Sequence, residues 1–277
     1  MREAALKTDA MKVDPVTWDD LDQISTLRPE GWSDISADFK FYIKTAWCNP
    51  IKVESGNKII AVGASISFGP TAWLAHIIVD KHYRRMGVGS FLVNELLLFL
   101  DSQGVQTCSL LATESGRPVY EKAGFRRVTD YVFMRRESPW QGSNISPSIL
   151  PAKDHHIQGI LQLDKAVSGE DRKLLIEANL IDAMVYTRNN DVCGFYLPQL
   201  KEGLIVAEDE EAGLALMNVK YAAVDKAVLP QNNKAGVSFL LNNGFVPTQS
   251  KGTRMIRGDA LHSSFSKMYS RIGGNLG

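Results

Sequence analysis

A short basic segment with two glycines lies between an apolar run and a long apolar-rich run, and it limits what this chain can fold into. Residues 73–79 read WLAHIIV, and residues 83–90, YRRMGVGS, lead into an apolar-rich stretch. We predict a strand over residues 71–80, a loop, and a helix through about Gln103. The first turn of a helix has N–H groups without intrahelical partners, and its dipole adds partial positive charge. This layout can therefore hold an anion.

The side chains of the loop favour a diphosphate. Gly87 and Gly89 remove side chains that would keep an anion away from the backbone. Arg84 and Arg85 add formal charge, which favours phosphate over carboxylate. A Walker loop would end in Gly-Lys-Ser or Gly-Lys-Thr, and a dinucleotide fingerprint would have a third glycine where Leu92 stands. The pattern that fits is Arg-x-x-Gly-x-Gly, residues 84–89.

Length and composition favour two domains and no nucleic-acid or membrane partner. The chain has 277 residues, with Lys plus Arg and Asp plus Glu both at 31, and a domain typically takes about 150 residues. Nucleic-acid and membrane-surface binders usually show a basic excess. Cys48, Cys108 and Cys193 lack CxxC spacing, so we expect reduced thiols, no metal site and a cytoplasmic protein. Residues 1–15 contain acids and no apolar core, which is unlike a secretory signal.

A serine- and proline-rich stretch, SPWQGSNISPSILP at residues 138–151, divides the chain. We predict a first domain over residues 1–138, a linker over 139–151 and a second domain over 152–277. Both halves show helix and strand patterns. The clearest turn signals are an N-cap at Thr17 and hairpins around Gly56-Asn57 and Asn189-Asn190. Short helices are expected to end at Gly124 and Gly244, and strands are expected over residues 105–113, 126–136, 222–229 and 253–258.

With its downstream elements, the first half resembles the GNAT superfamily of acetyl-CoA-dependent N-acetyltransferases. The resemblance rests on IIVDKHYRRMGVGSFLVNELL, followed about 30 residues later by VYEKAGF, and it covers about residues 14–136. It implies an α/β (α+β) fold, with a mixed central sheet flanked by helices. It also implies acetyl-CoA as co-substrate and the primary amine of a small molecule or peptide as acceptor.

The resemblance implies roles for single residues. The diphosphate of CoA would lie on Arg84, Arg85, Met86, Gly87, Val88, Gly89 and Ser90. The pantetheine arm and the thioester oxygen would meet the backbone of Ile77, Ile78 and Val79. Tyr120 matches the tyrosine that meets the CoA sulfur, and its phenol could protonate the leaving thiolate.

The group that takes the proton of the amine is less defined. The family often has a carboxylate or histidine at two strand positions that Trp73 and Ala75 hold here. His76 has the opposite parity along the strand, so we expect a structural histidine. Glu114 is our catalytic candidate, with an exposed loop glutamate or a chain of waters as alternatives. For acceptor binding we name Trp32 and Thr113. Asp34 and Asp38, near Trp32 in sequence, also suit a cationic amine, and core aromatics with surface acids are the alternative.

The second half echoes the first at an offset of 120 residues. Gly124-Phe125 corresponds to Gly244-Phe245, and a strand with a methionine follows each. At the same offset the loop falls on AEDEEAG, residues 207–213, whose carboxylates would repel a diphosphate. We predict a tandem arrangement in which the second, degenerate GNAT-like domain packs on the first and walls the acceptor site.

We therefore predict an N-acetyltransferase in which the amine attacks the thioester directly in a ternary complex. A non-catalytic acyl-CoA-binding sensor or scaffold is the alternative, because the strand base is missing. A nucleotide-binding oxidoreductase is disfavoured by the broken glycine fingerprint. The sequence leaves open the acceptor amine, the general base, any ligand of the second half and the oligomeric state, including a homodimer.

Overall fold

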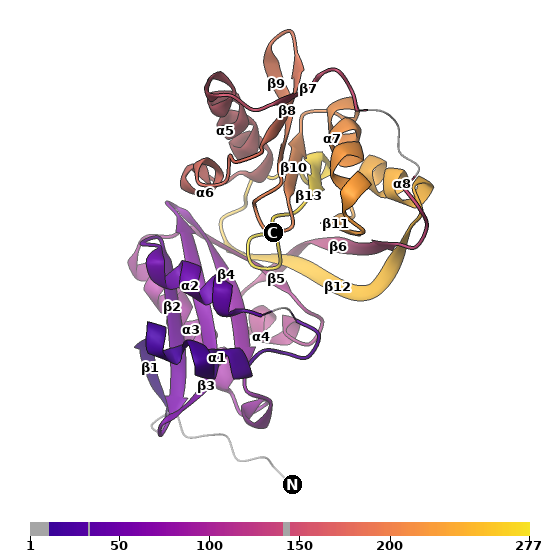
Figure 1. Cartoon of the computed structure of the whole chain (residues 1–277). Coiled ribbons are helices and arrows are strands. Elements are labelled where there is room, and N and C mark those ends of the chain that lie inside the picture. Colours follow the sequence, from indigo (N-terminus) through magenta and orange to yellow (C-terminus); the bar gives the residue numbers. More distant parts are fainter. Residues whose placement is uncertain (1–10, 33, 141–144) are drawn as a thin grey trace. The chain divides into compact units, whose positions relative to one another are not determined.

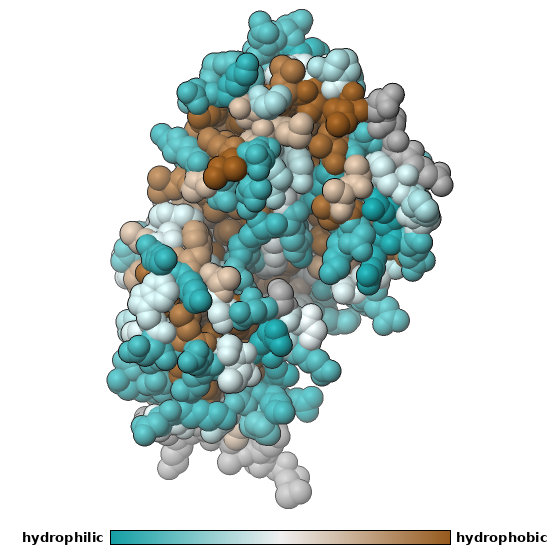
Figure 2. Space-filling view, viewed as in Figure 1, coloured by the Kyte–Doolittle hydropathy of each residue, from teal (hydrophilic) through white to brown (hydrophobic). Residues whose placement is uncertain are grey.

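The computed structural model describes residues 11–32, 34–140 and 145–277, and the chain forms two compact units (Figure 1). Each unit takes residues from separate parts of the sequence. Unit 1 comprises Met1–Leu110, Ser115–Arg126 and Ile256–Asp259. Unit 2 comprises Leu111–Glu114, Arg127–Met255 and Ala260–Gly277. In both units, hydrophobic side chains fill the core, and Figure 2 shows hydrophilic residues interspersed with hydrophobic ones over one face.

Unit 1 is built on a mixed sheet. Its strands follow the order β1 (Lys12–Pro15), β2 (Cys48–Ser55), β3 (Lys58–Phe68), β4 (Thr71–Val79) and β5 (Thr107–Ala112), followed by the Ile256–Gly258 end of β12 (Phe245–Gly258). Strands β1 to β4 are antiparallel, whereas β4 and β5 are parallel. The predicted hairpin turn is confirmed, because Ser55 pairs with Lys58 and Gly56 takes a positive φ of 62°.

Helices flank this sheet, as the fold-class prediction requires. They are η2 (Trp18–Asp20), α1 (Leu21–Thr26), α2 (Ser36–Lys44), η3 (Lys81–Tyr83), α3 (Val88–Ser102) and α4 (Arg117–Lys122). In Figure 1, α1 and α2 lie in front of the sheet and α3 lies behind it. The apolar residues of α3 recur at helical spacing and bury Val88, Leu92, Val93, Leu96, Leu97 and Leu100. The predicted cap at Thr17 is present, because its backbone N–H donates to Asp20 Oδ2 at 2.7 Å.

The last strand of the predicted first domain packs with the second half of the chain. Strand β6 (Arg126–Arg136) pairs antiparallel with β11 (Lys226–Pro230), and unit 2 holds all of β6 after Arg126. Unit 1 instead takes Ile256–Asp259, where the Asp259 N–H donates to Gln106 O at 3.2 Å. The compact units therefore do not follow a single cut in the sequence. The domain limits at 138 and 152 stay a prediction, and residues 141–144 of the predicted linker lie outside the described residues.

Unit 2 contains a second sheet whose neighbouring strands are antiparallel. Its order is β13 (Met268–Ser270), β10 (Leu204–Ala207), β9 (Asp191–Leu197), β8 (Met184–Arg188) and β7 (Ile149–Pro151). The predicted turn between β8 and β9 is confirmed, with φ of 54° at Asn189 and 69° at Asn190. The helices are α5 (Asp154–Ser168), α6 (Lys173–Glu177), α7 (Glu210–Ala223), α8 (Lys234–Asn242) and η4 (Phe265–Lys267).

Candidate functional site

The connection from β4 to α3 leaves the start of a long helix open to an anion. Gly87 is the N-cap residue of α3, and within the described chain no side chain caps this helix and no acid stands in its first turn. The N–H groups of that turn therefore keep their hydrogen-bonding capacity. Arg84 and Arg85 are exposed beside it, and Arg84 Nε donates to Val79 O at 3.1 Å, at the end of β4.

The two loop glycines serve different needs. Gly87 has φ of +89°, in the left-handed region that favours glycine, and a Cβ there would meet no described atom within 4 Å. Gly89 lies inside the first turn, and a Cβ there would lie 3.5 Å from Val79 Cγ2, an ordinary contact. First-turn N–H groups that no described side chain caps, with two exposed arginines beside them, are groups that a diphosphate such as that of CoA would bind.

The other predicted loop residues differ in exposure. Met86, Gly89 and Ser90 are half-buried, whereas Val88 is buried in the core. Val88 can therefore contribute only its backbone to a ligand, and Arg85, with a positive φ of 64°, turns the chain just before the helix.

Strands β4 and β5 pair only at their beginnings. Among the described residues, the ladder between them covers Thr71–Trp73 and Thr107–Ser109. Beyond it, β4 continues to Val79 along its pairing with β3, where Ile78 pairs with Val62 and Val79 with Ala61. An extended, amide-rich arm pairs with strand edges of this kind, and its contact with Ile77, Ile78 and Val79 stays a prediction.

A β-bulge interrupts β4 in this stretch and changes the expected orientation of His76. Ala75 pairs with Ala64 and Ile78 with Val62, so His76 and Ile77 together oppose Gly63. Paired residues share a face, so Ala75 and Ile78 share one although three positions separate them. The strict alternation that we assumed for His76 does not hold. His76 takes φ of +49°, and its ring contacts Phe39 and Tyr42 of α2.

Tyr120 lies on α4 and is 9% exposed. Burial raises the pKa of its phenol, so the hydroxyl keeps its proton throughout the neutral range. Its ring makes an edge contact with Phe125 at 6.0 Å between centroids, and its carbonyl accepts a hydrogen bond from the Phe125 N–H at 2.9 Å. The Gly124-Phe125 turn thus fixes the position of Tyr120.

The remaining candidates are distributed over both units. Trp32 is 43% exposed in unit 1, and its ring makes a T-shaped contact with the His76 ring at a centroid distance of 6.3 Å. Thr113 and Glu114 belong to unit 2. The Glu114 side chain is 74% exposed and lies 3.7 Å from Lys251 Nζ. Burial and specific partners therefore single out Tyr120 more strongly than Glu114, and the assignment of Glu114 stays a prediction.

Residues 47–127 match the family model of the acetyltransferase (GNAT) domain. The chain is 26% identical over 204 residues to the uncharacterized N-acetyltransferase YitH of Bacillus subtilis, an alignment that covers 68% of this chain and 69% of that protein. The GNAT domain that the motifs predict is thus confirmed over the matched residues, which contain the loop and Tyr120.

Two solved structures share the fold at low sequence identity. A Pyrococcus horikoshii protein, provisionally described as an acetyltransferase, superposes with a TM-score of 0.82 over 98% of both chains at 18% identity. A GCN5-related N-acetyltransferase from Sphaerobacter thermophilus superposes with a TM-score of 0.64, over 92% of this chain and 99% of that one, at 14% identity. The predicted fold class, a mixed central sheet flanked by helices, is confirmed. The tandem arrangement with a degenerate second domain stays a prediction.

The start of α7 in unit 2 contrasts with the start of α3. Asp209 caps α7 by accepting from the Ala212 N–H at 3.0 Å, and Arg188 donates to Asp209 and to Glu211. The hydrogen bonds from Arg188 and Ala212 hold the pKa of the Asp209 carboxyl below its usual range. The chain's own carboxylate therefore occupies the position that an anionic ligand would take.

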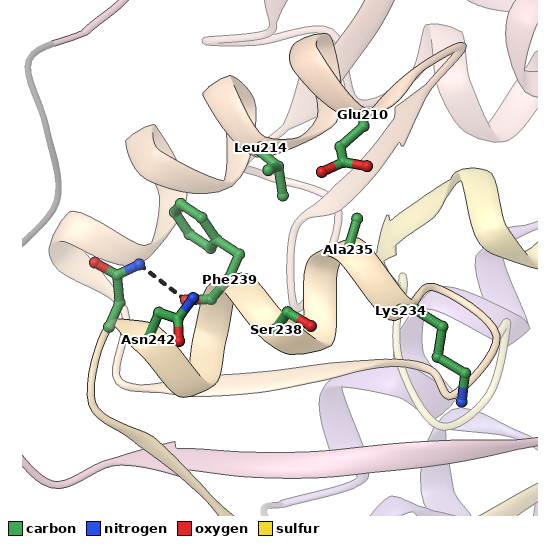
Figure 3. A pocket seen from close by; sticks show the side chains of 8 residues that line it. Glu210, Leu214, Lys234, Ala235, Ser238, Phe239 and Asn242 are labelled. Atoms are coloured by element: carbon green, nitrogen blue, oxygen red, sulfur yellow. Dashed lines mark hydrogen bonds between the residues drawn. The ribbon is translucent and has the colours of Figure 1, made fainter.

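A further pocket in unit 2 lies between α7 and α8 and has a volume of about 380 Å³ (Figure 3). Its lining is mixed and includes Glu210, Leu214, Lys234, Ser238 and Phe239. We find no sequence signal that would have predicted it.

In the described ranges, no group of three or more His, Cys, Asp or Glu residues could hold a metal ion. None of the described helices is long and apolar enough to cross a bilayer.

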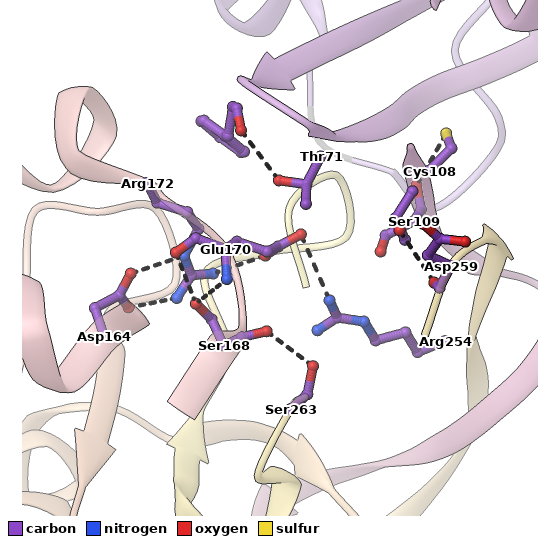
Figure 4. A network of polar contacts seen from close by, with 12 residues as sticks. Thr71, Cys108, Ser109, Asp164, Ser168, Glu170, Arg172, Arg254, Asp259 and Ser263 are labelled. Atoms are coloured by element: carbon purple, nitrogen blue, oxygen red, sulfur yellow. Dashed lines mark hydrogen bonds and ion pairs between the residues drawn. The ribbon is translucent and has the colours of Figure 1, made fainter. Parts of the chain in front are cut away.

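Figure 4 shows that Arg172 lies in a buried ion network of unit 2. Its Nε donates to Asp164 Oδ2 at 3.1 Å, and Glu170 lies 3.9 Å from its Nη1. Arg254 approaches the other oxygen of Glu170 at 3.7 Å. These four side chains are at most 2% exposed. Two acids and two bases therefore balance each other within the core of the unit.

Proposed function

We propose that this protein transfers an acetyl group from acetyl-CoA to the primary amine of a small molecule or peptide. The observation that carries the proposal is the start of α3, which no described side chain caps, with left-handed Gly87 and two exposed arginines, directly after a strand whose described ladder with β5 ends at Trp73. The match of residues 47–127 to the GNAT domain, and the relative named as an N-acetyltransferase, support it. Acetyl-CoA supplies an activated thioester.

Each part of the site has a role in this proposal. The first-turn N–H groups of α3, together with Arg84 and Arg85, bind the diphosphate. The backbone of Ile77, Ile78 and Val79 holds the pantetheine arm and offers an N–H to the thioester oxygen as it gains charge. Tyr120 keeps its proton because it is buried, so it can donate that proton to the leaving thiolate. Trp32 contacts the acceptor.

The test is steady release of CoA from acetyl-CoA in the presence of amines. The panel contains a diamine, an amino sugar, an α-amino acid and a short peptide, and calorimetry measures acetyl-CoA binding in parallel. Turnover with at least one amine is the expected result. Tight binding without turnover would favour the acyl-CoA sensor or scaffold instead, and absence of binding would contradict both.

A further inference from the structure

We propose that His76 takes the proton from the acceptor amine, and that Asp38 and Tyr42 hold its ring for this task. The inference rests on the proposed function, since a base is needed only if an amine attacks a thioester. It assigns the role that the sequence left open, to a residue whose strand parity argued against it.

The backbone of His76 is held in an unusual conformation. Its φ of +49° lies in the left-handed region, where a residue with a side chain is uncommon and strain of about 1–3 kcal/mol is typical. The residue lies in the bulge opposite Gly63, on the part of β4 that follows its described pairing with β5. Bulges re-aim side chains and are frequent beside active sites.

The bulge sends its two residues to opposite sides of the sheet. A Cβ added at Gly63 would lie 2.7 Å from Ile77 Cδ1 and 3.2 Å from Leu96 Cδ1, so Ile77 packs towards α3. The His76 ring packs instead against Phe39 and Tyr42 of α2. His76 is thereby placed beside Trp32 and Asp38, which we had named for the acceptor.

Both ring nitrogens of His76 have defined neighbours. The Tyr42 hydroxyl and His76 Nδ1 form a hydrogen bond of 2.8 Å, and Asp38 Oδ2 lies 3.5 Å from Nε2. When the Nδ1–H donates to the tyrosine oxygen, the lone pair of Nε2 faces the carboxylate. Two acceptors then stand beside each other, and a proton placed on Nε2 is stabilised by the charge of Asp38. The arrangement suits a ring that must gain a proton and release it.

The same neighbours suit the substrate before it reacts. The Asp38 side chain is 22% exposed and that of His76 is 10% exposed, while the Trp32 side chain is exposed to solvent. An ammonium group is attracted by a carboxylate and by the face of an indole. The acceptor therefore arrives as a cation attracted by Asp38, and its proton goes to the neighbouring His76.

The protons and bonds balance. The ammonium gives one proton to His76 Nε2, and the free amine forms the C–N bond while the C–S bond breaks. The nitrogen loses a second proton as the amide forms, which balances the proton that the leaving thiolate takes. His76 then returns its proton to solvent, so the net products are amide, CoA thiol and one proton.

The decisive variant is His76→Gly, because glycine accepts a positive φ and leaves space for a small base. We expect kcat/KM at neutral pH to fall by roughly 100-fold or more. Added imidazole should restore a measurable part of the loss. In the wild type, activity should decline as pH falls and the base becomes protonated. In the variant, the acid side of the pH–rate profile should follow only the ionisation of the acceptor amine.

Two controls separate catalysis from folding. Acetyl-CoA affinity and the melting temperature of His76→Gly report whether the site is still formed. His155→Gly removes an exposed histidine of α5 in unit 2 and should change neither the activity nor its response to imidazole. Asp38→Asn should move the acid limb to lower pH, because the imidazolium loses its counter-charge, whereas a merely structural role would leave the profile in place.

A readout without turnover uses protein labelled at histidine and examined by NMR. The resonance that is missing in His76→Gly identifies His76, and its titration should shift in Asp38→Asn and Tyr42→Phe.

The outcomes distinguish the two proposals. A wild type that binds acetyl-CoA but acetylates no amine overturns the proposed function, and with it the need for a base. An active wild type whose pH profile survives in His76→Gly overturns the role of His76 alone. Loss of activity in Glu114→Gln, together with an unaffected and imidazole-insensitive His76→Gly, would assign the role to Glu114.

Discussion

Gly87 and Gly89 stand two residues apart but meet different demands. Gly87 needs glycine for its left-handed backbone, whereas Gly89 has ordinary helical geometry and room for a small side chain. A substitution at Gly87 therefore changes both the backbone and the anion site. Gly89 is the position at which binding can be tested without straining the fold.

We expect Gly89→Glu to weaken acetyl-CoA binding by at least tenfold. A carboxylate in the first turn would stabilise the helix through the dipole but would repel the diphosphate. Calorimetry measures the affinity, and thermal unfolding should show little change. Ser102→Glu adds the same charge at an exposed position at the other end of α3 and should leave affinity unchanged. Equal affinities of both variants would place the diphosphate elsewhere.

Tyr120→Phe should lower kcat far more than it lowers acetyl-CoA affinity. Phenylalanine keeps the ring that packs on Phe125 and removes only the proton donor. Loss of a general acid typically costs roughly 100-fold or more in rate. The measurements are kcat with the best amine of the panel and the dissociation constant of acetyl-CoA. A variant with unchanged kcat would leave Tyr120 as a packed aromatic residue.

Lys220 of α7 gives a pH-dependent stability that can be measured. Its side chain is buried, and its Nζ donates to Glu202 O, Gly203 O and Ser270 Oγ. Burial lowers the pKa of its amine to about 7, although Glu202 opposes the shift. Between pH 7 and 10.5 the unfolded state therefore binds more protons than the folded state, so stability should rise with pH by about 1 kcal/mol per unit.

Denaturant titrations of wild type and Lys220→Met between pH 7.5 and 9.5 check this slope. The variant should lose it, whereas Lys226→Met, at an exposed lysine of β11, should keep it. Identical slopes in all three proteins would contradict the assignment to Lys220.

At the scale of single residues, the sequence predicts the strand–loop–helix junction better than the orientation of His76. Glycines and arginines near such a junction have few physical uses, so Arg84, Arg85, Gly87 and Gly89 can be named from the sequence. The orientation of His76 depends on a β-bulge, in which two residues of β4 oppose Gly63 of β3. Alternation along one strand contains no information on such a partner, and the assumed parity was therefore wrong.

At the scale of elements, local signals predicted the hairpins and helices, and lengths depended on packing. Gly-Asn and Asn-Asn pairs supply positive φ in tight turns, which fixes β2–β3 and β8–β9. The strand expected over residues 222–229 begins at Lys226 because α7 continues to Ala223. The strand expected over 253–258 is the end of the longer β12, which starts at Phe245. Pairing with distant strands decides such lengths.

The end of β12 makes a tight backbone contact that Gly258→Ala should break. Gly258 has φ of +90°, and a Cβ there would lie 1.9 Å from Gln106 O. We expect the free energy of unfolding to fall by about 2 kcal/mol or more, because backbone must move as well as adopt a strained φ. Denaturant titration gives the value for this variant.

Gly69→Ala is the matched control, since Gly69 also has a positive φ, of 63°, but a Cβ there would meet nothing within 4 Å. It should cost about 1 kcal/mol from backbone strain alone. If the two variants had equal free energies of unfolding, the contact between Gly258 and Gln106 O would not be the reason that position 258 needs glycine.

At the scale of the whole molecule, α3 and α7, which begin near positions that correspond at the offset of 120 residues, differ in what their first turns can bind. The start of α3 has no side-chain cap among the described residues, whereas Asp209 caps α7 and Arg188 neutralises the acids there. The difference was visible in the sequence because the residue types at the two junctions are opposite in charge. Domain limits were less accessible, since a serine- and proline-rich stretch marks a break in composition and does not show which strands pair across it.

We expect one CoA molecule to bind per chain. Isothermal titration with CoA should give a stoichiometry of one, and Gly89→Glu should remove that site without revealing another. A stoichiometry of two would show that the second half also binds the coenzyme, and the prediction of a degenerate copy would then be wrong.

The membership of Ile256–Asp259 in unit 1 has a consequence for biosynthesis. A ribosome that has released Arg126 must add about 130 further residues before these four emerge. At usual elongation rates this takes on the order of ten seconds. Throughout that interval the nascent first unit lacks its final strand segment, and an unpaired sheet edge attracts foreign strands. The sheet of unit 1 is therefore completed only after residues 127–255 have been synthesised, which gives chaperones a defined period in which to shield its open edge.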